Sequence, residues 1–191
     1  MSSRILLLVL GLVIGGAIWG IRPMDTSQMV PFVSVARAQT AADSPYANAD
    51  SLVEVPSLEK LTVRNTIYVP AYSTLRLGSG KGTLELATTL SIQNTSEERS
   101  LILLRVDYIG TAGKVLHRYL ERPIAIRSLG SVQAFVAAED TRGGTGANFI
   151  VEWAAEGKIT EPLVEAVMVG TKGTQGFSFT SRGKAMTIAT P

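Results

Sequence analysis

The residues that could do chemistry are densest between Asp140 and Trp153, DTRGGTGANFIVEW. Gly143, Gly144 and Gly146 give the backbone freedom either to make an awkward turn or to let another molecule approach closely. A phosphate-cradling loop would lie between a strand and a helix and would carry a lysine after its last glycine. Here the residues that follow indicate a strand and no lysine is adjacent, so we do not expect a nucleotide site.

Oxygen donors surround these glycines at Glu139, Asp140, Asn148 and Glu152. Hard cations such as Ca²⁺ take about six to eight oxygens, several of them from one loop, and this spacing matches no such loop. The simplest interpretation is structural: Asp140 caps the turn, Asn148 hydrogen-bonds across the loop and Glu152 faces solvent. A contact with a partner or ligand is the alternative that remains open for these side chains.

Catalytic alternatives are few. Glu152 and Glu165 could act as paired carboxylates of a hydrolase, which need to lie about 5–10 Å apart across a cleft. His117 is the single histidine and cysteine is absent, which excludes thiolate chemistry and, within one chain, a site with several histidines. His117 is flanked by Leu116 and Arg118 and is expected to be a surface or half-buried strand residue. We expect no metal and no cofactor.

Aromatic residues offer a second kind of contact surface. Phe149, Val151 and Trp153 fall on one face of a predicted strand and are expected in the core. Tyr68 and Tyr72 flank Pro70, which lacks an N–H and therefore favours a sheet edge or a strand end. An exposed edge beside these tyrosines is a candidate partner surface. The remaining aromatic candidates for a binding face are Phe177 and Phe179.

Short strands with a period of two must position these residues. The clearest runs from Thr83 to Asn94, and its predicted buried face consists of Leu84, Leu86, Leu90 and Ile92. In the strand 101–109 the predicted shared face consists of Ile102, Leu104, Val106 and Tyr108. A hairpin loop at 110–113 leads to a returning strand at 114–120. Further strands are predicted at 123–128, 131–138, 148–153, 163–170, 177–180 and 184–188, and single helical turns at 58–63 and 160–165.

Strands at short spacing indicate an all-β fold, and we expect an antiparallel sandwich resembling the immunoglobulin fold over residues 61–191. Residues 39–60 are expected to form a flexible tether. Residues 1–38 predict an N-terminal helical signal or anchor, with Arg4 before an apolar run from Ile5 to Ile21 and a possible cleavage site at Ala36–Ala38. Both a cleaved signal peptide and an uncleaved membrane anchor remain open, and both place the rest of the chain outside the cytoplasm.

Charge argues against nucleic-acid binding. The net charge of +2 arises in the leader, since residues from Gln39 onward carry 15 basic and 15 acidic residues. A neutral domain lacks the basic stripe that a phosphate backbone requires.

Five motifs resemble the bacterial family called domain of unknown function 3124, over about Arg64 to Lys184. The motif at 143–153, GGTGANFIVEW, is the most specific, and the others are YVPAYS at 68–73, LATTLSIQNT at 86–95, PLVEAVM at 162–168 and QGFSF at 175–179. The resemblance implies an exported globular domain and carries over no catalytic residue. We therefore expect an exported, non-catalytic module of the cell envelope that binds an envelope protein or a small ligand, through loop 140–148 and Tyr68–Tyr72. The alternative is a carboxylate-dependent hydrolase near the glycine-rich loop.

Overall fold

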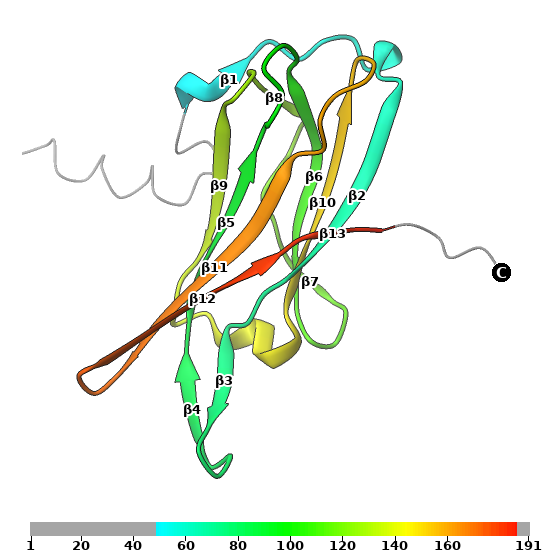
Figure 1. Ribbon diagram of the computed structural model, residues 1–191. Helices are drawn as coiled ribbons and strands as arrows, with labels where there is room; N and C mark the ends of the chain where they lie inside the picture. The colour runs from blue at the N-terminus through cyan, green and yellow to red at the C-terminus, as the bar shows by residue number, and fades with distance from the viewer. Residues whose placement is uncertain (1–48, 187–191) are drawn as a thin grey trace, which may run out of the picture. The chain divides into compact units, whose positions relative to one another are not determined.

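The computed structural model describes residues 49–186, which form two antiparallel sheets and a separate hairpin (Figure 1). The leader and the first part of the expected tether lie outside the described residues. The seven-stranded sheet has the order β1-β8-β6-β10-β2-β13, with β7 also paired to β6, and the four-stranded sheet has the order β12-β11-β5-β9. The hairpin pairs β3 with β4. The chain is therefore all-β, as its alternating pattern predicts.

The strands of the larger sheet are β1 (Leu52–Val53), β2 (Val63–Pro70), β6 (Leu101–Ile109), β7 (Val115–Arg118), β8 (Ile124–Ile126), β10 (Asn148–Ala155) and β13 (Lys184–Ala185). Those of the smaller sheet are β5 (Ala87–Gln93), β9 (Ser131–Val136), β11 (Leu163–Lys172) and β12 (Gln175–Arg182), and the hairpin consists of β3 (Thr74–Leu77) and β4 (Gly82–Glu85). Three short 3-10 helices complete the described chain: η2 (Ala49–Ser51), η3 (Leu58–Lys60) and η4 (Thr141–Gly146).

One hydrophobic core lies between the two sheets. Phe149, Val151 and Trp153 of β10 pack there as predicted, together with Leu90 and Ile92 of β5. The predicted inward face of 83–94 is confirmed, because Leu84 and Leu86 are buried as well. That segment nevertheless forms two strands, since β4 ends at Glu85 and β5 begins at Ala87. The Leu86 amide donates to the Ser73 carbonyl at 3.0 Å between them.

A β-bulge in β6 divides the face that was predicted to be shared by Ile102, Leu104, Val106 and Tyr108. The prediction of one shared face is therefore wrong. Glu152 of β10 lies opposite Arg105, but the next residue, Trp153, lies opposite Leu103, so Leu104 has no partner in the register. An extra residue reverses which side chains point inward. Leu103 therefore packs in the main core, whereas Ile102 belongs to a separate cluster on which Leu104 packs.

The segment 52–61 packs on the larger sheet, although residues 39–60 are predicted to form a flexible tether. Leu52 and Val53 pair with Ile126 and Ala125 of β8. Val55 and Leu61 pack against Ile102, Ala125 and Ala154 on the face of the sheet opposite the main core.

The two predicted helical turns had different outcomes. Residues 58–60 form η3, so that turn is confirmed. Residues 160–162 are irregular and β11 begins at Leu163, so the turn predicted at 160–165 is wrong. Among residues 49–186 no helix is long and apolar enough to cross a bilayer.

Candidate functional site

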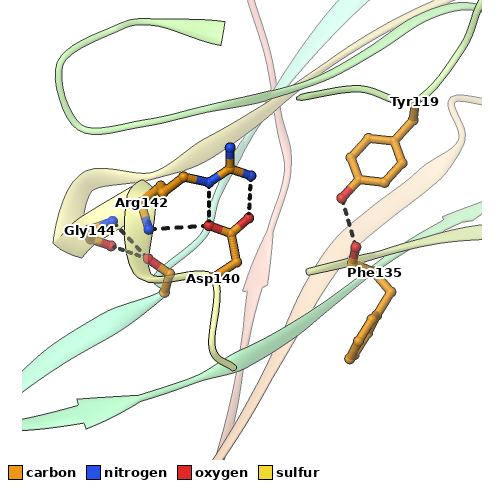
Figure 2. Close-up of polar contacts among 6 residues, drawn as sticks. Tyr119, Phe135, Asp140, Arg142 and Gly144 are labelled. Carbon is orange, nitrogen blue, oxygen red and sulfur yellow. Dashed lines mark hydrogen bonds and ion pairs between the residues drawn. The ribbon is translucent and has the colours of Figure 1, made fainter. Parts of the chain in front are cut away.

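The glycine-rich loop forms η4 between β9 and β10 and is held at its start by Asp140. The Asp140 carboxylate accepts a hydrogen bond from the Arg142 backbone N–H at 3.3 Å, as the predicted turn cap requires. The Arg142 guanidinium also donates to both carboxylate oxygens, from Nε to Oδ1 and from Nη2 to Oδ2, each at 2.7 Å (Figure 2). The side-chain hydrogen bonds from Arg142 lower the pKa of Asp140, and this effect exceeds the rise in pKa that partial burial of the carboxyl group causes. A carboxylate held ionised in this way is a poor general acid.

The glycines are required by close packing and by backbone conformation. A Cβ at Gly143 would overlap the Tyr108 hydroxyl, because Gly143 is buried against that ring. Gly144 has φ +72°, a left-handed conformation that favours glycine, and a Cβ there would lie 2.8 Å from Thr111 Oγ1. The loop therefore fits tightly onto β6 and the hairpin loop that follows it.

Several polar backbone groups of the loop are bonded to neighbouring parts of the protein. The Ser73 hydroxyl lies 2.7 Å from the Gly144 N–H, and the Thr111 hydroxyl oxygen lies 2.9 Å from the Gly146 N–H. Thr111 Oγ1 also donates to the Gly143 carbonyl at 2.8 Å. An anion-binding loop would instead leave its N–H groups free to donate to a ligand, so the glycines serve the fold at this end of the sandwich.

The two predicted contact segments, Tyr68–Tyr72 and 140–148, meet in space. Asn148 lies opposite Pro70 in the pairing of β10 with β2, and the Ala71 N–H donates to the Ala147 carbonyl at 2.9 Å. Tyr108 hydrogen-bonds Ser73 beneath them, and burial raises the pKa of the Tyr108 hydroxyl. The two segments thus close one end of the sandwich together.

Tyr68 and Tyr72 do not flank an open edge, so that expectation is wrong. Pro70 is the last residue of β2, as its missing N–H predicts, but Tyr68 pairs with Lys184 of β13 on the side away from β10. Tyr68 is 37% exposed on the outer face, whereas Tyr72 is partly buried with its ring 5.9 Å from that of Phe179. The two tyrosines therefore do not form one contact surface.

Asn148 and Glu152 belong to β10, which begins directly after the turn. Asn148 is 9% exposed, and within residues 49–186 its side chain makes no hydrogen bond across the loop, contrary to the prediction. The Glu152 carboxylate lies 3.4 Å from Arg105 Nε on the outer face of the larger sheet. Glu165 alternates with the core residues Val164 and Ala166 of the other sheet and so points outward from the opposite side. The two glutamates do not face one another across a cleft.

His117 lies on β7 and is exposed, as expected, with its ring 4.5 Å from that of Tyr119 in an edge-on contact. The Tyr119 hydroxyl donates to the Phe135 carbonyl at 2.8 Å (Figure 2). Among the described residues no three histidines, aspartates or glutamates gather as a metal site would require.

An open groove of about 750 Å³ lies at the same end of the sandwich, next to the two hairpins β3–β4 and β11–β12. Both hairpins extend beyond the packed sheets in Figure 1. The groove is lined by Val169, Gly170, Phe177 and Glu85 among others, with Phe177 36% and Val169 47% exposed. Gly170 allows the hairpins to approach, because a Cβ there would lie 2.6 Å from the Glu85 carbonyl oxygen.

Sequence reasoning named Phe177 as an aromatic candidate but missed the groove. The sequence predicts one continuous strand over 83–94. In the structure β4 separates from β5 and pairs with β3 instead, so the hairpin that borders the groove was not predicted. Gly170 was the available signal, since a glycine inside an apolar strand often marks a close backbone approach.

Comparison with known families identifies the chain. The model of a family described as "Protein of unknown function (DUF3124)" matches residues 64–186. The chain belongs to this family. A solved structure described as "Crystal Structure of Thermotoga maritima 1070" is similar over 63% of this chain and 92% of its own, with 12% sequence identity and a TM-score of 0.37. A similarity at this level establishes neither a shared fold nor a shared function. The comparison with curated proteins gave no match.

The DUF3124 motifs at 68–73 and 143–153 meet where the glycine loop packs on Ser73. A third motif, 175–179, begins β12 and contributes Phe177 to the groove. The resemblance read from the sequence thus marks both the closed end of the sandwich and the hairpin beside it.

Proposed function

We propose that this DUF3124 protein is an exported, non-catalytic binding module of the bacterial cell envelope, and that it contacts a protein partner through the groove between its two hairpins. The observation that carries the proposal is the exposure of Phe177 and Val169 within a concave surface. Apolar side chains in such a surface are typical of contact sites. The loop 140–148 lies at the same end of the fold and is bonded through Gly144 to Ser73, directly before β3.

Export is proposed from the sequence. Arg4, the apolar run 5–21 and the small residues at 36–38 are typical of a secretory leader, whether it is cleaved or retained as an anchor. We also propose that the sandwich is related to the immunoglobulin fold. The two-sheet antiparallel architecture supports this part of the proposal. A hydrolase is not proposed, because Asp140 is bound by Arg142 and Glu152 points away from Glu165.

In-cell photo-cross-linking tests this function. A photoreactive amino acid at Phe177 should yield a discrete cross-linked product in the periplasmic or membrane fraction. The same residue at Val115, which is 44% exposed on β7, is the matched control and should yield none. Equal products from both positions, or a protein found only in the cytoplasm, would contradict the proposal.

A further inference from the structure

The strand β12 presents a long, unpaired edge. It pairs with β11 over all eight of its residues, from Gln175 to Arg182, without a register shift. Within residues 49–186 its other side makes no backbone hydrogen bond. Such an edge exposes N–H and C=O groups that can pair with another extended chain.

The other strands at sheet edges in the described chain are shorter than β12, since β7 has four residues and β9 has six. The terminal strands β1 and β13 have two residues each. The edge strand β9 has the Phe135 carbonyl occupied by the Tyr119 hydroxyl. Natural proteins also protect edges with charged residues, proline or bulges, and the stretch from Gln175 to Ser181 has none of these. Among the strands that end the two described sheets, β12 therefore has the longest unpaired edge.

The two hairpins are basic, although the chain from residue 39 onward is neutral. The hairpin segments 74–85 and 163–182 together carry four basic residues, Arg76, Lys81, Lys172 and Arg182, and two acidic ones, Glu85 and Glu165. Among the described ion pairs none involves these basic residues. Complementary charge favours and orients association, so the open edge suits a partner of net negative charge.

We propose that β12 binds an extended acidic segment of a partner protein as an additional β-strand, with an apolar side chain of that segment in the groove beside Phe177. The backbone of β12 supplies hydrogen bonds, and the groove supplies side-chain selectivity, which is the usual division in strand addition. This inference rests on the proposed function and specifies its partner. Lys172, paired with Gln175 at the base of the hairpin turn, lines the groove and attracts the acidic side chains.

The probe is a fluorescent peptide of alternating valine and glutamate, as long as β12, titrated into the full chain and followed by anisotropy. It should bind, whereas the matching valine–lysine peptide should not. Lys172→Glu should weaken binding about fivefold through charge repulsion, and Phe177→Ala should weaken it about fivefold through lost apolar contact. Lys158→Glu and Val115→Ala are exposed controls on other elements and should leave the affinity unchanged.

Amide hydrogen exchange then locates the peptide. Strand addition should protect alternate amides of β12, because alternate residues of an edge strand direct their N–H groups outward. Protection confined to another surface, or equal binding of both peptides, would overturn the inference. Concentration-dependent dimers that bury β12 would also overturn it and would indicate a second copy as the occupant. If Phe177 still cross-links in cells while the acidic peptide fails to bind, the proposed function stands and strand addition is wrong.

Discussion

Gly143 is buried against the Tyr108 ring, and its constraint arises from packing. The sequence predicts a conformational need for the loop glycines, and that need is met at Gly144, whose φ is +72°. Gly143 is required for a different reason, because a Cβ there would overlap the Tyr108 hydroxyl. No local pattern could predict this contact, since Tyr108 lies 35 residues away and reaches the loop only after β6 and β10 have paired.

Gly143→Ala should therefore destabilise the protein by about 2–3 kcal/mol, the cost of forcing an extra group into a packed site. Gly113→Ala is the matched control, because Gly113 has φ +74° with nothing near its missing side chain. It should cost about 1–2 kcal/mol from the left-handed backbone alone. Urea unfolding of the two variants and the wild type gives both values.

Tyr108→Phe provides a direct test of the clash. By itself it should cost about 1 kcal/mol, because Tyr108 loses its hydrogen bond with Ser73. Combined with Gly143→Ala it should be less destabilising than the sum of the two single changes by at least about 0.5 kcal/mol, since the overlapping hydroxyl is gone. Strict additivity would show that the Tyr108 hydroxyl is not what requires a glycine here.

At the scale of elements, alternation predicted faces well wherever a strand is regular. Leu86, Leu90 and Ile92 are buried as predicted, because each strand of a sandwich has one face in the core. The same rule failed at Leu104, where one unpaired residue exchanges the two faces of β6. The bulge arises from the pairing of β6 with β10, so the hydrophobic pattern of β6 alone does not predict it.

The alternation of buried and outward side chains from Leu86 into β5 gives a prediction of its own. Leu86→Ala and Leu90→Ala should each destabilise the fold by about 2–5 kcal/mol, because both side chains are fully buried. Thr89→Ala lies between them on the outward face and should change stability by less than about 0.5 kcal/mol. Chemical denaturation of the three variants measures this, and similar small losses at all three positions would contradict the described register.

At the scale of the whole molecule, apolar side chains pack on both faces of the larger sheet. The main core covers one face, and the segment 52–61 covers a patch of the other through Val55 and Leu61. Composition indicated a tether here, because the stretch from Gln39 to about Ser57 is rich in alanine, aspartate, serine and proline. Its pairing with β8 depends on a strand more than 70 residues away, which explains why local sequence did not predict it.

A truncated protein that begins at Gln39 should fold, since it retains η2, β1 and η3 together with both sheets. A protein that begins at Thr62 should be less stable by about 3 kcal/mol, because it exposes Ile102, Ala125 and Ala154 to water. Each has Trp153 as its single tryptophan, and that residue is 3% exposed, so its fluorescence reports unfolding in urea.

The matched control keeps the backbone of 52–61 and removes only its apolar contacts. Val55→Ala with Leu61→Ala, in the protein that begins at Gln39, should reproduce most of the loss seen on truncation to Thr62, since these two side chains provide the cover. If the double variant retains full stability while the truncated protein loses it, the pairing of β1 with β8 is what stabilises the sheet. Equal stability of all three proteins would show that the segment is a tether, as its composition suggests.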